Sequence, residues 1–289
     1  MKRVPRDWTN VNMLGWMPWE NDRTLPFTMA GVRGQAWVKV LGWDTETGAE
    51  SLVYKLSPGW SAERIENTVP EDLIVWQGEL EIGGNTLHRY GYSYRPAGHS
   101  VGPCSSPIGA TVVAFCGSAE QELYSKIPVP ALDTESMPWR RNTRAHDTMR
   151  AYWKPLRGDE ETLDLYWLGF NAAGSYVEEV ATHEGVAELE EAFFFEAGAP
   201  PVTLYEAWEG RMARMHGGAG SYVCHGAVAH SAYYKQPNPA DMIYFKHDGY
   251  AYSEHADPAH EEYLAMFPKE TPAVRAFREG RDPGLPPMF

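Results

Sequence analysis

The sequence predicts an all-β protein with a duplicated module, and three observations support this. The chain contains 11 Trp and 16 Tyr, residues that favour strands. It also contains 27 Gly and 22 Pro, which indicate many turns. Short apolar runs such as ESLVYKL at 50–56 and DLIVWQG at 72–78 have the pattern of strands.

An internal repeat predicts the duplication. Residues 39–59 and 154–174 share Lys, Leu, Asp, Thr and Gly at a constant offset of 115 residues. EDLIVWQGEL at 71–80 then matches EAFFFEAGAP at 191–200, because each has a carboxylate, six residues and a Gly. The later matches keep the same order: YRPAGHSVGP (94–103) with VCHGAVAHSA (223–232), and ATVVAF (110–115) with DMIYFK (241–246). The sequence therefore predicts a module of roughly 100 residues that occurs twice.

Little helical periodicity occurs outside the C-terminal end. DPAHEEYLAMF has Asp257 as a helix cap with Pro258 at the first helical position, and TPAVRAFREG stops at Gly280. The expected organisation is an N-terminal arm (1–34), a first module (35–125), a polar, proline-bearing linker (126–150), a second module (151–257) and a helical tail (258–289).

Charge and hydropathy exclude several partners. The formal net charge of −14 argues against nucleic acid or an anionic membrane surface. No run of 18 apolar residues exists, and the N-terminus lacks the apolar stretch of a signal peptide. The three cysteines show no CxxC spacing, which suits a reducing compartment. We therefore expect a cytoplasmic protein.

The repeated motifs resemble those of the cupin superfamily. The resemblance rests on the carboxylate, six residues and Gly, followed by a P-x-G turn near a His in RPAGH at 95–99. It covers about residues 35–255, and the layout is similar to ChrR-like cupins and a related bicupin family. The resemblance implies two jelly-roll cupin barrels in tandem, between a short N-terminal arm and a C-terminal helical tail.

The first copy has lost most of the metal ligands that the resemblance implies. The family's H-x-H falls on Ile65 and Asn67, its Glu on Glu71 and its last His on Val101. His99 in the turn could substitute, but with Glu71 alone it makes a poor metal site. We expect the first barrel to be free of metal or to bind it weakly.

The second copy keeps a ligand set. The resemblance implies His183, Glu191 and His230 as metal ligands, with His225 as a fourth ligand or a neighbouring donor. Glu188 is the alternative carboxylate, and Glu191 is preferred because its spacing to a Gly agrees with the first copy. Strand alternation puts Glu191 on one face with two phenylalanines at 193 and 195, and we expect this face to line the barrel interior.

Two imidazoles and a carboxylate suit one divalent metal ion. Fe(II) is favoured, and Zn(II), Mn(II) and Ni(II) are alternatives. Three protein ligands leave coordination positions open to a small-molecule substrate, and the aromatic strands favour an apolar or aromatic one. His225 or Tyr222 is the candidate for moving a proton.

We expect a non-haem dioxygenase, by analogy with the families it resembles. A metal-dependent isomerase, decarboxylase or lyase is the first alternative. A ChrR-like metal- or ligand-sensing protein is the second, and a structural shell with vestigial sites is the third. Association of two copies into a homodimer is one further expectation.

Overall fold

The computed structural model describes residues 6–19, 26–44, 47–118, 125–141, 151–158, 165–171, 176–180, 189–195, 202–208, 211–217, 219–224, 231–235 and 242–249. Within these ranges every regular element is a strand, except for one 3-10 turn at Val11–Met13, so the prediction of an all-β protein is confirmed. The expected helical tail at 258–289 lies outside them. No helix in the described part of the chain is long and apolar enough to cross a membrane.

The N-terminal module contains a seven-stranded sheet and two smaller sheets. The large sheet runs in the order β2 (Met17–Pro18), β4 (Ala36–Trp43), β5 (Glu50–Leu56), β14 (Ala110–Cys116), β8 (Glu71–Gly78), β11 (Tyr92–Arg95) and β15 (Val129–Leu132). One smaller sheet has four strands, in the order β10 (Asn85–Leu87), β9 (Leu80–Ile82), β13 (Cys104–Ser106) and β6 (Trp60–Ala62). The other has three strands, in the order β12 (Ser100–Val101), β7 (Arg64–Asn67) and β3 (Phe27–Ala30). All these pairings are antiparallel, as in a jelly roll.

The described part of the C-terminal module repeats the large sheet and has one smaller sheet. Its seven-stranded sheet runs in the order β16 (Arg140–Arg141), β17 (Ala151–Arg157), β18 (Leu165–Asn171), β25 (Met242–Gly249), β20 (Leu189–Phe194), β23 (Ser221–Cys224) and β1 (Arg6–Asn10). A four-stranded sheet is built from β19 (Tyr176–Val180), β24 (Ser231–Lys235), β21 (Val202–Trp208) and β22 (Arg211–Gly217).

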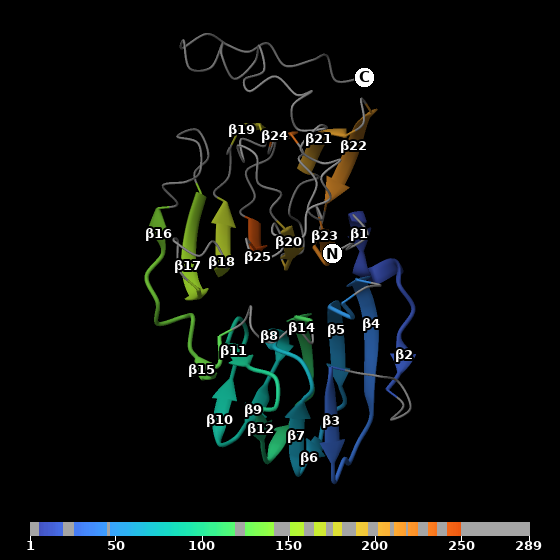
Figure 1. Cartoon of the computed structure of the whole chain (residues 1–289), viewed down its shortest axis with the longest axis vertical. Helices are drawn as coiled ribbons and strands as arrows, with labels where there is room; N and C mark the ends of the chain where they lie inside the picture. The colour runs from blue at the N-terminus through green and yellow to red at the C-terminus, as the bar shows by residue number, and fades with distance from the viewer. Residues whose placement is uncertain are drawn as a thin grey trace.

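The two modules exchange edge strands. β1, close to the N-terminus, pairs with β23 of the C-terminal module, while β2 returns to β4 of the N-terminal module (Figure 1). The segment expected to be a linker also contributes a strand to each module. β15 pairs with β11 of the N-terminal module, and β16 pairs with β17 of the C-terminal module. Each module is therefore completed by a strand that comes from outside it.

The repeat is also visible in matched side chains. The buried ammonium of Lys39 donates a hydrogen bond to the carbonyl of Val11 at 2.7 Å. Lys154, its counterpart at the offset of 115 residues, donates to the carbonyl of Thr134 at 2.7 Å. Each lysine thus fixes one of the two crossing segments to the strand that begins its module.

The two large sheets pack against each other through one apolar cluster. Phe115 of β14 stacks on Phe245 of β25 with ring centroids 4.6 Å apart, and Trp76 of β8 packs edge-on against Phe193 of β20. A second cluster fills the interior of the N-terminal module. The strands of the large sheet are therefore buried on both faces, which explains their nearly continuous apolar runs.

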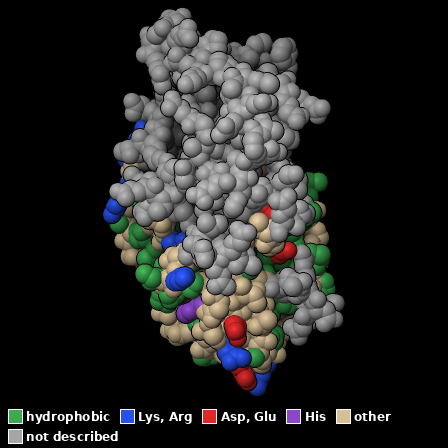
Figure 2. All heavy atoms as spheres, in the orientation of Figure 1, with side chains coloured by type: hydrophobic (Ala, Val, Ile, Leu, Met, Phe, Trp, Pro, Cys, Tyr) green, Lys and Arg blue, Asp and Glu red, His purple; other side chains and the backbone are tan. Residues whose placement is uncertain are grey.

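The described surface and the cysteines add two smaller observations. On the face drawn in Figure 2, acidic and basic side chains lie next to one another at the lower end of the N-terminal module. Cys104, Cys116 and Cys224 are buried thiols that form no disulfide.

Candidate functional site

The motif positions of the first copy converge inside the N-terminal module. Ile65 of β7 lies opposite Val101 of β12 in the antiparallel register. Asn67 of β7 donates its side-chain amide to the carboxylate of Glu71 at 2.8 Å. The assignment of these four positions from the sequence therefore groups residues that are neighbours in space.

The carboxylate of Glu71 is fully buried and surrounded by donors. It accepts hydrogen bonds from Asn67 and from the hydroxyl of Tyr54 at 3.0 Å, and it forms an ion pair with the guanidinium of Arg95. Burial, with Cys116 and Glu71 beside the ring, raises the pKa of Tyr54 well above 10.0, so its hydroxyl stays a donor.

This arrangement does not fit a divalent metal. Arg95 already supplies the positive charge that neutralises Glu71, and the Arg95 side chain is only 5% exposed. A second cation beside this guanidinium would meet its charge at short range in a buried site. Burial, with the charge of Arg95 as the second cause, lowers the pKa of His99, so its protonated form is disfavoured.

An apolar cavity opens beside this ion pair. It is small, with a volume of about 30 Å³, and aromatic and aliphatic side chains of the interior cluster line it together with Arg95. Three buried donor atoms on its lining residues have no acceptor in the described part of the chain: Nε and Nη1 of Arg95 and Nε1 of Trp60.

Glu191 of the second copy is buried, but it does not face the interior of its own module. Its carboxylate accepts hydrogen bonds from Ser51 of β5 and from Tyr222 of β23. Nδ1 of His247 lies 3.9 Å from the same carboxylate. The expectation that Glu191 lines the barrel interior is therefore wrong, because the face it shares with Phe193 packs on the N-terminal module.

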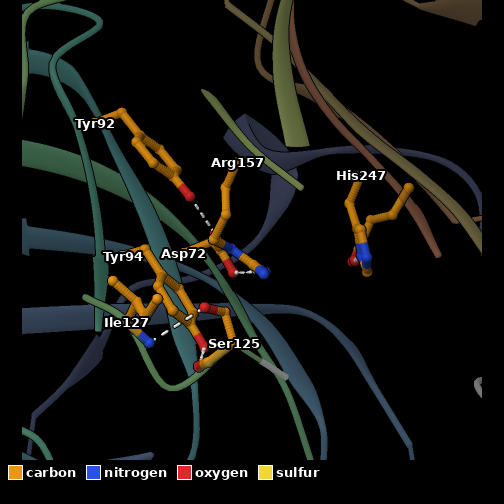
Figure 3. Close-up of polar contacts among 8 residues, drawn as sticks. Asp72, Tyr92, Tyr94, Ser125, Ile127, Arg157 and His247 are labelled. Atoms are coloured by element: carbon orange, nitrogen blue, oxygen red, sulfur yellow. Dashed lines mark hydrogen bonds and ion pairs between the residues drawn. The ribbon is translucent and has the colours of Figure 1, made fainter. Parts of the chain in front are cut away.

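The counterpart of Glu191 in the first copy is Asp72. Asp72 accepts from the hydroxyl of Tyr92 and forms a two-point ion pair with Arg157 of β17, both contacts at 2.8 Å (Figure 3). Tyr92 lies opposite the residue two positions after Asp72, and Tyr222 lies in the same relation to Glu191. Both carboxylates thus belong to the contact between modules.

A β-bulge explains why sequence spacing gave a different match. The register between β14 and β8 passes from Thr111 opposite Gln77 to Val112 opposite Val75, so Trp76 is an extra residue in β8. Because of this extra residue, an equal spacing between carboxylate and Gly in the two copies does not identify equivalent carboxylates, and the match is wrong by one position. By register, the position that corresponds to Glu71 is 190, which holds Glu190 and lies opposite Asp248 of β25.

The other predicted ligands lie outside the described residues. These are His183, His225 and His230, together with the alternative carboxylate Glu188, and their metal-binding roles stay predictions. Tyr222 is described: it is fully buried between the modules and donates to Glu191, and its role in proton transfer also stays a prediction. No group of three or more metal-ligating side chains occurs among the described residues.

Sequence reasoning missed Arg95, which the structure puts at the centre of the first site. The available signal was a lone arginine at the end of YSYR, a strand with alternating aromatic residues. An arginine at such a position must find a buried partner or remain exposed. Glu71, opposite Arg95 in the register of β8 and β11, was the partner to look for.

Comparison with solved structures identifies the fold of the chain. The chain has the cupin fold. It is similar to a candidate dioxygenase from Nostoc punctiforme, with 16% identity, a TM-score of 0.62 and coverage of 86% of this chain and 84% of the other.

Two further neighbours are similar at lower identity. An oxalate decarboxylase variant from Bacillus subtilis shows 11% identity and a TM-score of 0.55, with 98% and 86% covered. A cupin 2 conserved barrel domain protein from Leptotrichia buccalis shows 8% identity and a TM-score of 0.50, with 85% and 97% covered. No protein-family model and no curated protein sequence matches the chain.

Proposed function

We propose that the protein is a metal-dependent cupin enzyme that acts on a small organic molecule, with one divalent metal in its C-terminal module. The observation that carries this proposal is the contrast between the two copies. In the first copy, Arg95 pairs with the motif carboxylate, and the histidine positions hold other residues. The second copy keeps three histidines near its motifs: His183, His225 and His230.

The carboxylate ligand that we propose is Glu190. Its position corresponds to that of Glu71 by strand register, whereas Glu191 already accepts hydrogen bonds from Ser51 and Tyr222. Glu188 remains the alternative, because it keeps the spacing after the first histidine. Glutamine at each of the three positions keeps size and removes charge, so metal titration of the three variants separates them.

The reaction proposed is that of a non-haem dioxygenase that uses Fe(II). Bound iron would supply the redox chemistry, and the protein would supply the position and surroundings of the substrate. The similarity to a candidate dioxygenase supports this reaction. The similarity to oxalate decarboxylases, for which a B. subtilis structure concerns Mn(II) centres, favours a decarboxylase as the second candidate.

Metal analysis and oxygen uptake test the proposal. Protein purified without a histidine tag is analysed for bound metal, reconstituted with Fe(II) or Mn(II), and supplied with small aromatic and aliphatic acids. Substrate-dependent oxygen uptake with Fe(II) supports the dioxygenase. Carbon dioxide release without net oxygen consumption supports the decarboxylase. Absence of turnover combined with ligand-dependent release of a bound protein would instead favour the sensing alternative.

A further inference from the structure

The interior face of the C-terminal sheet carries a lysine. On β25, Phe245 stacks on Phe115 of the N-terminal module. Two residues later, Nδ1 of His247 lies 3.9 Å from Glu191, in the same contact between modules. Side chains alternate along a strand, so Lys246, which lies between these two residues, points the opposite way, into the interior of its own module.

Lys246 has accessible surface on this interior side. It lies opposite Trp167 of β18 and Ala192 of β20, the strands that flank β25 (Figure 1). Trp167 and Ala192 are buried, whereas Lys246 is partly exposed. Both edges of β25 are hydrogen-bonded and its other face is covered by the N-terminal module, so the exposed surface of Lys246 lies in the module interior.

An aromatic wall stands beside the ammonium group. Nζ of Lys246 lies 5.2 Å from the ring centroid of Trp167. Trp167 in turn packs edge-on against Trp153 of β17, with ring centroids 5.3 Å apart. The lysine therefore presents its charge next to flat apolar surface rather than among other polar groups of the sheet.

The first copy has no charge at this position. Strand register equates Lys246 with Ala114 of β14, which lies between Leu52 of β5 and Leu73 of β8. These three residues are buried and belong to the apolar cluster that fills the N-terminal module. The same place in the fold is thus closed by packing in one copy and holds an accessible lysine in the other.

The ligand that matches this lysine is an aromatic anion. An ammonium group supplies three donors and a full positive charge, which suit a carboxylate. The indole rings of Trp153 and Trp167 offer flat apolar surface to an aromatic ring. The position of Glu190, the proposed metal ligand, lies diagonally across from Lys246, and diagonal neighbours in a sheet are about 7–8 Å apart. One small molecule can therefore reach both places.

We propose that Lys246 binds the carboxylate of the substrate in the C-terminal module, and that the substrate is therefore a small aromatic carboxylic acid. This inference rests on the proposed function, because it names the substrate class of the same site. Lys246 holds the charged end of the molecule and so selects acids over neutral compounds of the same shape.

Binding of benzoate to the chelator-treated full chain tests the inference without metal or turnover. Benzamide is the neutral counterpart of benzoate and has nearly the same shape. Calorimetry should show one saturable benzoate site, and benzamide should bind about tenfold more weakly or worse, because it lacks the charge-assisted hydrogen bond.

Two variants and a matched control locate the carboxylate. Lys246→Met should weaken benzoate binding by about tenfold or more, whereas Lys246→Arg keeps the charge and should restore most of the affinity. The control is Lys55→Met, because Lys55 is exposed and its Nζ lies 5.9 Å from the ring centroid of Trp37, outside either module interior. Near-ultraviolet circular dichroism confirms that all three variants are folded.

Chemical modification gives an independent readout. The wild-type protein is acetylated with a water-soluble ester, and the modified lysines are identified by peptide mass spectrometry. Saturating benzoate should slow the acetylation of Lys246 and leave that of Lys55 unchanged. Equal acetylation of Lys246 with and without benzoate would contradict a direct contact.

Four binding results would overturn the inference. They are no saturable benzoate site, equal binding of benzamide, unchanged binding by Lys246→Met, and a loss in Lys246→Arg as large as that in Lys246→Met. Tighter metal binding by Lys246→Met would also overturn it, because the lysine would then neutralise the ligand carboxylate as Arg95 neutralises Glu71.

The proposed function fails in a different way. A chain that binds benzoate through Lys246 but takes up no metal would refute the metal-dependent enzyme and keep the carboxylate site. A chain that binds metal and turns over a substrate, but binds benzoate independently of Lys246, would refute this inference alone.

Discussion

Two adjacent carboxylates, Glu71 and Asp72, are buried on opposite faces of one strand, and each is paired with an arginine. Glu71 faces the module interior and meets Arg95, while Asp72 faces the other module and meets Arg157. Burial disfavours the charged form of Arg157, but the charge of Asp72 and its hydrogen bonds outweigh this and raise the pKa of the guanidinium well above its usual value. One pair therefore organises an interior site and the other joins two modules.

Removing one partner of the interior pair should be more damaging than removing both. Arg95→Met leaves a buried carboxylate without its cation and should lower the free energy of unfolding by about 3–5 kcal/mol. Adding Glu71→Gln should restore most of this loss. Urea unfolding of both variants measures the difference, and equal stabilities would show that the charge of Glu71 is neutralised elsewhere.

The pH dependence of stability should reveal His99. Burial and the charge of Arg95 lower its pKa below 6.5 in the folded state, so below pH 6.5 the unfolded chain binds more protons. The contribution of His99 should therefore lower stability as the pH falls from 6.5. Titration of the His99 ring by nuclear magnetic resonance should show a higher pKa in Arg95→Met/Glu71→Gln. An unchanged pKa would contradict the assigned effect of Arg95.

The two crossing segments are each held by a lysine and a tryptophan. Nζ of Lys39 lies 4.3 Å from the ring centroid of Trp16, and Nζ of Lys154 lies 4.4 Å from that of Trp139. Such a contact adds cation–π attraction to the backbone hydrogen bond that each lysine makes. The same lysine–tryptophan contact occurs in both copies, so the repeat in the sequence corresponds to a repeat in the structure.

Replacing either lysine should loosen its crossing segment. Lys39→Met leaves the carbonyl of Val11 without its charged donor and should cost about 1–3 kcal/mol, and Lys154→Met should cost a similar amount. The exposed Lys126 serves as the control through Lys126→Met. Chemical denaturation measures all three. A loss for Lys126→Met as large as that for Lys39→Met would contradict the role given to the hydrogen bond.

The strands themselves could be predicted from the sequence, but one register could not. The predicted strand at 50–56 is β5, and the run at 72–78 belongs to β8. Alternation of apolar residues gives a strand and its two faces, but it does not reveal a bulge such as that at Trp76. Because one extra residue reverses every later side chain, the match between the two carboxylate motifs failed by one position.

At the level of the molecule, the modules share an apolar core that the sequence did not reveal. A strand buried on both faces gives no signal for which face belongs to the module interior and which to the neighbouring module. Glu191 was assigned to the wrong face for this reason, although its grouping with Phe193 was right. Partners distant in the sequence, such as Ser51, can be found only from coordinates.

The close packing of the two modules against each other can be tested at Gly42. A methyl group there would lie 2.6 Å from the hydroxyl oxygen of Tyr222, which is too close for a normal contact. Gly42→Ala should therefore destabilise the protein by about 1–3 kcal/mol. Tyr222→Phe removes the clashing oxygen, so the double variant should lose less than the sum of the single losses. Strict additivity would show that the two residues are not in contact.

The division of roles between the modules is tested most directly by metal stoichiometry. Mass spectrometric metal analysis of the untagged protein, after dialysis against excess divalent metal and removal of unbound metal, should give one equivalent per chain. His230→Ala should lose that equivalent, and Arg95→Met/Glu71→Gln should keep it, because the N-terminal module contributes no ligand. Two equivalents in the wild type, none at all, or one equivalent lost from the Arg95→Met/Glu71→Gln variant and kept by His230→Ala would contradict this division.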